Sequence, residues 1–205
     1  MPLQETPPLE VDCIIPAAGL SSRMGDWKLM LAYKNHTILD QCIENALSFC
    51  SRVILVAGFR GKELMARYQD TPNILVVINE HFSMGMFGSI QLGAQQVNTE
   101  HFFITHGDMP LIDSEVFHAL WQRRAQVVFP GNIERSGHPV LLPQSIVPLI
   151  VSAPIKSKMK SIIKSQKVEH LGLTTTSIHL DVDTPEAYQA LLNYHSAAVL
   201  RHLSN

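Results

Sequence analysis

Residues 13–28 join a short apolar segment to a turn of small and hydroxyl-bearing residues that also carries two cations. Arg23 and Lys28 stand five residues apart in this turn, behind Ala17-Ala18-Gly19. Small residues let backbone N–H groups approach a ligand closely, and an arginine with a lysine can neutralise several phosphate oxygens at once. The turn is therefore expected to hold a nucleoside triphosphate by its phosphates.

This turn has neither of the two commonest phosphate-binding spacings. Gly19 and Gly25 are six residues apart and Lys28 lies three further on, which does not fit a Walker loop, and Gly19 lacks the second glycine of a dinucleotide-binding turn. The run from Ala17 to Lys28 instead resembles the signature of the MobA-like nucleotidyltransferases, roughly Leu-Ala-Ala/Gly-Gly-x-Ser-x-Arg-Met-Gly-x-x-Lys. The resemblance implies that Arg23 and Lys28 are catalytic. It also implies a nucleotide site that comprises Pro16, Ala17, Ala18, Gly19, Ser21, Ser22, Arg23, Gly25 and Lys28.

Two acidic positions are candidates for holding the cation that a triphosphate reaction needs. That cation is usually Mg²⁺, bound by one or two carboxylates together with phosphates and water. Asp108 follows an apolar strand and Asp183 precedes a helix, and both segments resemble elements of the same family. The resemblance implies that Asp108 is catalytic and binds both metal and nucleotide, and that Asp183 is the second metal ligand. Asp181 stays open as the alternative ligand, and Asp183 could also cap the helix.

The segment Ser83–Gly93 is similar to an element of the MocA branch of this family, which attaches cytidylate to molybdenum cofactor. The matching positions are Gly85, Met86, Ser89 and Gly93, whereas Gln91 replaces an arginine. The resemblance implies that Gly85 and Ser89 contact the nucleotide. Ala17-Ala18-Gly19 is typical of the cytidylyl branch and favours CTP, although uridylyltransferases of sugar phosphates share it.

The acceptor side is marked by one histidine and a lysine-rich segment. Gly137-His138-Pro139-Val140 resembles the family segment that follows the acceptor loop, so His138 is expected to line the acceptor pocket. Lys156, Lys158 and Lys160 stand where the branch has an arginine, and Lys158 is taken as the acceptor-binding candidate. A solvated helix face is the alternative for these lysines. His106 is expected to have a packing role.

Alternating strands and helices must position these residues. The apolar segments expected as strands are Val11–Ile15, Arg52–Ala57, Asn73–Ile78, His101–Thr105, Val127–Pro130, Pro139–Leu142 and Thr176–Leu180. The expected helices are Ile38–Ser48, Gly61–Tyr68, Gly88–Gln96, Ser114–Arg124 with Ser114 as N-cap, Ser145–Ile150, Lys156–Lys164 and Pro185–Ser196. Apolar strands separated by helices predict a three-layer α/β fold with a mostly parallel, doubly wound sheet. The resemblance specifies a fold like that of nucleotide-diphospho-sugar transferases.

Length, composition and charge limit the number of domains and the kinds of partner that are expected. The 205 residues, 46% of them hydrophobic, are expected to form an extended leader over residues 1–10 and a single domain over residues 11–205. A formal net charge of -2 offers no general attraction for nucleic acid or an anionic membrane. Cys13, Cys42 and Cys50 form no metal-binding pair and suit a reducing compartment, so a cytoplasmic location is expected.

These observations predict a Mg²⁺-dependent nucleotidyltransferase that moves a nucleoside monophosphate, preferably CMP, onto a phosphorylated acceptor and releases pyrophosphate. The resemblance implies molybdopterin as the acceptor and a molybdenum hydroxylase as a partner. Two alternatives remain: transfer to a sugar phosphate or another small phosphate, and a non-catalytic accessory protein for molybdoenzyme maturation.

Overall fold

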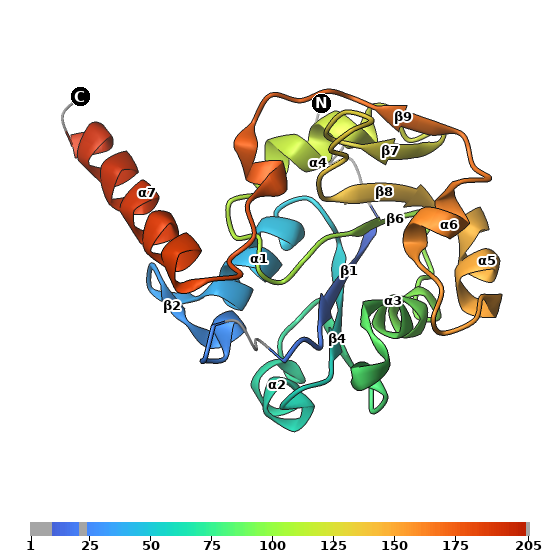
Figure 1. Cartoon of the computed structure of the whole chain (residues 1–205), viewed down its shortest axis with the longest axis horizontal. Helices are drawn as coiled ribbons and strands as arrows, with labels where there is room; N and C mark the ends of the chain where they lie inside the picture. Colours follow the sequence, from blue (N-terminus) through green and yellow to red (C-terminus); the bar gives the residue numbers. More distant parts are fainter. Residues whose placement is uncertain (1–9, 21–23, 204–205) are drawn as a thin grey trace, which may run out of the picture.

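A seven-stranded sheet lies at the centre of the computed structural model (Figure 1), which describes residues 10–20 and 24–203, with side chains described up to residue 194. All of the expected leader except Glu10 lies outside the described residues. In spatial order the strands are β5 (Ile74–Ile78), β4 (Arg52–Ala57), β1 (Asp12–Ala17), β6 (His101–Ile104), β8 (Val140–Pro143), β7 (Val127–Phe129) and β9 (Val168–His170). A separate small hairpin consists of β2 (Ala32–Tyr33) and β3 (His36–Thr37).

The strand pairing confirms the predicted mostly parallel, doubly wound sheet. β1 pairs in parallel with β4 and with β6, and β4 pairs in parallel with β5. β8 is antiparallel to both β6 and β7. The order of the strands reverses at β1, so the carboxyl ends of β1 and β6 flank the crevice where such sheets bind ligands.

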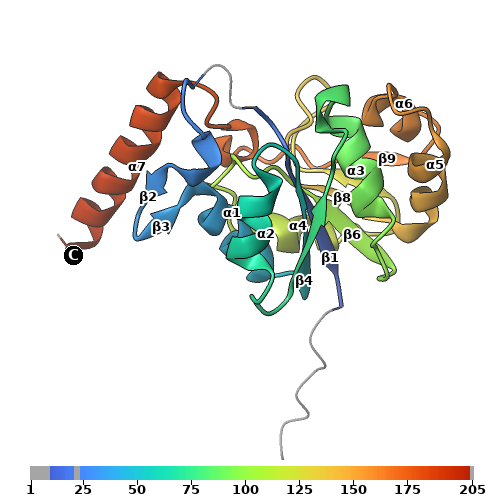
Figure 2. The ribbon, with the colours of Figure 1, turned by 90° about the horizontal axis from the view of Figure 1, so that it is seen from below.

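Helices cover both faces of the sheet (Figure 2). They are α1 (Ile38–Leu47), α2 (Gly61–Tyr68) and α4 (Ser114–Trp121) on one face, and α3 (Met86–Ala94), α5 (Val147–Ser152) and α6 (Met159–Ile163) on the other. The strands alternate accordingly, because successive side chains point to opposite faces: Cys13 and Ile15 pack in the first core and Ile14 in the second. The two cores hold the strand ends, and hence the loops after them, in place.

Local capping explains where helices begin. Thr37 and Asp40 form a reciprocal capping box at the start of α1. At α4 the N-cap is Asp113 rather than the predicted Ser114, because the Asp113 carboxylate accepts hydrogen bonds from the backbone N–H groups of Glu115 and Val116. The final helix, α7 (Pro185–Leu203), has Pro185 in its first turn, as predicted, but is longer than expected.

Several segments differ from the predicted strands, among them β2 and β3, which were not predicted. Thr176–His179 is a 3₁₀ helix rather than a strand, because Ser177 and Ile178 are buried while the Ile178 carbonyl accepts from the His138 N–H outside any ladder. β9 was not predicted; it pairs in parallel with β7 at the sheet edge. None of the helices in the described part of the chain is long and apolar enough to cross a membrane.

Candidate active site

The predicted phosphate turn follows β1 directly. Ala18 and Gly19 continue from the strand, and Ser21, Ser22 and Arg23 lie outside the described residues. Gly25 has a φ of +70°, a conformation that a side chain would strain. The chain then enters a 3₁₀ turn, Lys28–Met30, whose Leu29 is buried in the first core. That anchor fixes Lys28 at the end of the turn.

Lys28 joins three segments that are distant in the sequence. Its Nζ lies 2.5 Å from Asp108 Oδ2 and also forms an ion pair with Asp183 Oδ1. Asp108 follows β6, and the Val182 N–H donates to the Asp108 carbonyl over 2.9 Å, which joins the two acidic segments through their backbones. The structure therefore brings Lys28, Asp108 and Asp183 together, as the sequence predicted they should lie.

The two aspartates of the last segment have different surroundings. Asp181 is exposed, whereas the side chain of Asp183 is 23% exposed and pairs with Lys28. The Thr184 hydroxyl accepts from the Ala187 N–H at the start of α7. Because Thr184 caps the helix, Asp183 is available to Lys28.

The charge of Lys28 is maintained by its partners. Burial alone would lower its pKa, but the charge of Asp108 and the hydrogen bonds to Asp108 and Asp183 raise it above the ordinary value. The side chain thus stays an ammonium between two carboxylates. This arrangement suits the binding of a polyphosphate, whose oxygens could share the ammonium.

The residues present fit a hard divalent cation. Asp108 Oδ1 is buried and has no hydrogen-bond partner among the described residues, so one carboxylate oxygen is available to a ligand. Within residues 10–20 and 24–203, no group of three His, Cys, Asp or Glu side chains could hold a metal by itself. Two carboxylates suit Mg²⁺ in particular, since it retains water and substrate phosphates as ligands.

A cavity of about 290 Å³ adjoins the start of the turn. Its walls include Pro16, Ala18, Gly19, Gly85 and Ser89, which were predicted to bind nucleotide, together with Leu20, Phe82, Ser83 and Met86. Gly85 has a φ of +110°. The buried Ser89 hydroxyl accepts a hydrogen bond from Asn79 Nδ2 over 3.0 Å, which orients the hydroxyl and leaves its O–H able to donate to a ligand. Asn79 was not recognised in the sequence.

Gly58 permits the close packing behind this cavity. A Cβ at Gly58 would lie 2.5 Å from Phe82 Cβ and 2.7 Å from Ala18 Cβ. The next residue, Phe59, donates its N–H to the Ala18 carbonyl over 3.3 Å. The end of β4 therefore supports the phosphate turn from behind.

Two histidines lie beside the acidic site. The rings of His106 and His138 have centroids 4.0 Å apart, and His106 Nδ1 lies 3.9 Å from Asp108 Oδ1. Burial and the charge of Lys28 lower the pKa of His106 to about 4, and burial with the adjacent His106 lowers the pKa of His138 to about 3. Both rings are neutral at pH 7. The sequence indicated only packing for His106, and no local pattern marked its proximity to Asp108.

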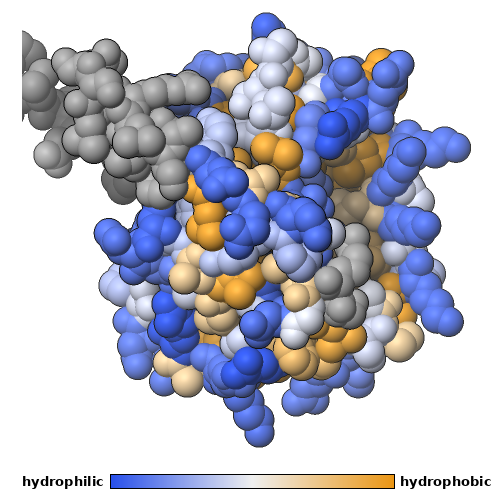
Figure 3. All heavy atoms as spheres, turned by 60° about the vertical axis from the view of Figure 1, so that its left-hand side comes forward, coloured by the Kyte–Doolittle hydropathy of each residue, from blue (hydrophilic) through white to orange (hydrophobic). Residues whose placement is uncertain are grey.

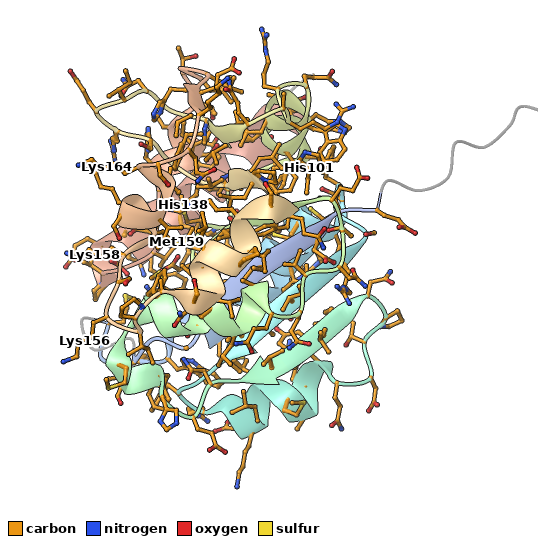
Figure 4. The ribbon with its side chains drawn as sticks, turned by 90° about the vertical axis from the view of Figure 1, so that its right-hand side faces the viewer. His101, His138, Lys156, Lys158, Met159 and Lys164 are labelled. Atoms are coloured by element: carbon orange, nitrogen blue, oxygen red, sulfur yellow. The ribbon has the colours of Figure 1, made fainter. Side chains whose placement is uncertain are left out.

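A second, larger cavity of about 710 Å³ begins at these histidines. It lies between the sheet and α6, and its lining is mainly apolar. Lys160, Lys164 and Lys158, the lysine predicted from the sequence, are all exposed, but only Lys160 and Lys164 belong to the lining. Lys158 is the N-cap residue of α6, and in Figure 4 its side chain points outward from the edge of the molecule.

The fold and these contacts are those of a transferase that binds a nucleoside triphosphate at the end of a parallel sheet. Residues 13–171 match the MobA-like NTP transferase domain, and the chain belongs to this family of nucleotidyltransferases. It is a homologue of molybdenum cofactor cytidylyltransferase from Escherichia coli (strain K12): the two are 40% identical over 179 residues, which are 87% of this chain and 93% of that protein.

Solved structures show the same fold at lower identity. A nucleotidyl transferase from Methanothermobacter thermautotroptrophicus superposes with a TM-score of 0.79 at 15% identity, covering 92% of this chain and 99% of that one. Rv0371c from Mycobacterium tuberculosis H37Rv, solved in complex with manganese, gives 0.71 at 19% identity, covering 90% and 99%.

Proposed function

We propose that this chain transfers CMP from CTP to the phosphate of molybdenum cofactor and releases pyrophosphate. The observation that carries the proposal is the ion-pair cluster of Lys28, Asp108 and Asp183, placed where the phosphate turn, β6 and the start of α7 meet. The identity to the E. coli cytidylyltransferase over most of both chains supports this acceptor and this nucleotide.

The chain's own residues supply binding and charge. The smaller cavity would take the cytidine, with Gly85 and Ser89 in its wall. Lys28 would bind the triphosphate oxygens and stabilise the charge that develops as the bridging bond breaks. Arg23, which lies outside the described residues, is proposed to do the same.

Asp108 and Asp183 would hold Mg²⁺. When bound, the ion neutralises phosphate charge during the transfer. The second proton of a phosphate monoester leaves near pH ~6, so the attacking phosphate is already charged at neutral pH and needs no general base. The low pKa values of His106, about 4, and His138, about 3, agree with this, because they make both imidazoles weak bases at neutral pH.

The two alternatives receive less support from the structure. Sugar phosphates require many polar partners, whereas the larger cavity is lined mainly by apolar side chains. A purely accessory protein would need no buried lysine between two carboxylates. We further propose that the chain acts in the cytoplasm, where CTP is available, and delivers its product to a molybdenum hydroxylase.

The test is pyrophosphate release with Mg²⁺ and each of CTP, GTP, UTP and ATP, with molybdenum cofactor or a set of sugar phosphates as acceptor. We expect release with CTP and molybdenum cofactor, and a product heavier than the acceptor by one cytidylyl group. Lys28→Ala should raise the KM for CTP and lower kcat, since Lys28 is proposed both to bind the triphosphate and to stabilise the charge that develops during transfer. Release with a sugar phosphate alone would refute the acceptor, and a silent chain that still binds CTP would support the accessory function.

A further inference from the structure

We propose that Arg60, at the corner between β4 and α2, is a positioning residue of the phosphate turn: its guanidinium packs on the Trp27 ring and so holds the neighbouring Lys28 in place for the triphosphate. This inference rests on the proposed function, because it takes Lys28 to be a ligand of the triphosphate. Arg60 itself does not contact the nucleotide in this arrangement and acts through Trp27.

Trp27 is the buried residue near the end of the phosphate turn. Gly25 and Asp26 before it are exposed, whereas Trp27 is 8% exposed and belongs to the first core. Trp27 directly precedes Lys28 and is the N-cap residue of the 3₁₀ turn that begins there. Together with the buried Leu29, it anchors the backbone on both sides of Lys28. The position of the indole therefore affects the position of the ammonium.

Two side chains of the β4–α2 corner pack against the indole. The guanidinium carbon of Arg60 lies 4.3 Å from the centroid of the Trp27 ring. Phe59 meets the same ring edge to face, with centroids 6.3 Å apart and an interplanar angle of 86°. A cation is attracted to the face of an indole by the negative potential of the ring. Trp27 Nε1 is buried and has no hydrogen-bond partner among the described residues, so ring packing orients the indole there.

The same corner also contacts the start of the phosphate turn. Phe59 donates its backbone N–H to the Ala18 carbonyl over 3.3 Å. Ala18 precedes the turn and Trp27 lies near its end, so residues 59 and 60 contact both ends of it. Contacts at both ends restrict the positions that the segment between them can adopt.

The backbone of Arg60 indicates that its side chain is required at this corner. Arg60 has a φ of +52°, in the left-handed region where a Cβ costs free energy and glycine is favoured. Glu63 orients the guanidinium: Arg60 Nε donates to Glu63 Oε1 over 2.5 Å, and Arg60 Nη2 donates to Glu63 Oε2. The hydrogen bonds with Glu63 raise the pKa of Arg60 more than desolvation lowers it, and the charges of Glu63 and Asp26 raise it further. A strained arginine is thus held as a cation over the ring.

Equilibrium binding without an acceptor tests the inference. The probes are CTP with Mg²⁺ and inorganic tripolyphosphate with Mg²⁺, each titrated onto the full chain by calorimetry. We expect Arg60→Gly to raise both Kd values about threefold to fivefold, which corresponds to the loss of one partly exposed cation–π contact. Its thermal unfolding should stay close to that of the wild type, because glycine adopts this φ without strain. Arg60→Lys keeps a cation that can lie over the ring, and should restore most of the affinity.

The matched control is Arg124→Ala, which removes the same kind of contact elsewhere. The Arg124 guanidinium carbon lies 4.8 Å from the Trp121 ring centroid, and Trp121 packs against His101 at the first residue of β6, the end of that strand far from Asp108. Both Kd values should be unchanged in this variant. An equal loss of affinity in Arg124→Ala and Arg60→Gly would show a general effect of arginine removal and overturn the inference.

A double-mutant cycle decides whether Arg60 acts through Trp27. Trp27→Ala should raise the Kd for CTP about tenfold, because the turn loses its buried anchor beside Lys28. Arg60→Gly should then add no further loss. If the two substitutions weaken binding independently, Arg60 contacts the triphosphate itself and the positioning role is wrong.

Fluorescence follows the indole in a chain that keeps Trp27. The sequence contains two tryptophans, so Trp121→Phe leaves Trp27 as the single emitter. In this background, Arg60→Gly should make the emission several-fold more sensitive to quenching by acrylamide, since the guanidinium no longer covers the ring. Unchanged quenching would mean that Phe59 and the core hold the indole without Arg60, which also overturns the inference.

The two probes separate this inference from the proposed function. If the wild-type chain transfers CMP, and Arg60→Gly changes neither Kd, the positioning role is wrong and the function stands. If Arg60→Gly weakens tripolyphosphate binding, but no nucleotidyl transfer occurs with any acceptor, the function is wrong and the positioning of the turn by Arg60 stands.

Discussion

At the scale of single residues, Lys28 is the side chain that connects the charged groups of the site. One ammonium contacts carboxylates from two segments, Asp108 after β6 and Asp183 before α7. The side chains of Lys28 and Asp108 are only 13% and 14% exposed, so water screens their interaction weakly. The ammonium of Lys28 is therefore already positioned when a triphosphate binds here.

Asp108→Asn should reduce turnover by a factor of about 100 or more, since preorganised charge at a transferring phosphate contributes this much in enzymes. The amide keeps the shape of the side chain but removes one charge, which faces Lys28 and is proposed to bind the metal. Pyrophosphate release measures the rate, and thermal unfolding verifies that the variant folds.

Asp181→Asn is the control, because this exposed neighbour of Asp183 should retain the wild-type rate. A strong loss in Asp181→Asn with little change in Asp183→Asn would mean that the second metal ligand is Asp181.

At the scale of elements, side-chain contacts between neighbouring helices, strands and loops hold the elements around the phosphate turn in place. Asp40 closes the capping box of α1 and also accepts hydrogen bonds from Arg67 and Tyr68 of α2, so it joins two helices of one layer. Gly58 brings the end of β4 against Ala18 and Phe82. The Asp40 contacts hold α1 and α2 together, and the Gly58 contact supports the phosphate turn from behind.

Asp40→Asn should destabilise the fold by about 2 kcal/mol at neutral pH. Burial alone would raise the pKa of Asp40, but hydrogen bonds from Arg67, Tyr68 and Thr37 lower it to about 2. A lowered native pKa means that this stability is fully present above the unfolded value near pH ~4 and is lost as the pH falls toward ~2. Urea unfolding of the wild type and of Asp40→Asn at pH 7, 4 and 3 measures the free energy of unfolding of each. The difference between the two free energies should become smaller as the pH falls. Asp70→Asn, at an exposed carboxylate, should show no such convergence.

Gly58→Ala should cost about 1–3 kcal/mol and raise the KM for CTP several-fold, because the added methyl would displace Phe82 and Ala18 in the wall of the smaller cavity. Gly93→Ala provides a matched control: its Cβ would lie 2.6 Å from Ile14 Cγ2, in the core behind α3. If Gly58→Ala and Gly93→Ala change the KM for CTP equally, the added methyl at Gly58 acts through loss of stability and not through the wall of the smaller cavity.

At the scale of the whole molecule, α7 ties the end of the chain to the site. In Figure 2 it lies beside β2 and β3, away from the seven-stranded sheet. On the side seen in Figure 3, apolar side chains lie in small groups among polar ones. Leu191 is buried with Tyr33, Ile38, Cys42 and Val182, and the Tyr188 hydroxyl donates to the Ala32 carbonyl over 2.7 Å. This third cluster holds the segment that carries Asp183.

Leu191→Ala should lower the free energy of unfolding by about 2–5 kcal/mol, as large-to-small changes in cores do. Because the cluster also positions Asp183, we expect kcat to fall more than the KM for CTP rises. Gln189→Ala, at an exposed position of the same helix, should change neither quantity. A stability loss without any change in kcat would disconnect α7 from the reaction.

Much of this protein could be predicted from local sequence. The strand Arg52–Ala57 and the helix Gly61–Tyr68 appear in the structure with the predicted boundaries, because an uninterrupted apolar run and helical spacing are local properties. The parallel sheet follows from their alternation. The turn from Ala17 to Lys28 and the two acidic segments were identified by their residue types and by their resemblance to segments of the nucleotidyltransferase family.

What the sequence could not decide depends on contacts between distant segments. Thr176–His179 has strand-like composition but forms a 3₁₀ helix, since its hydrogen bonds go to the loop at His138. Spacing alone does not say which lysine of 156–164 borders the larger cavity; the position of α6 against the sheet places Lys160 and Lys164, both exposed, at its edge and leaves Lys158 outside the lining. Residue types and their order thus determined the fold class and the charged groups of the site. Only tertiary packing decided which of those groups share one space, because burial and distance between remote segments exist only once the chain is folded.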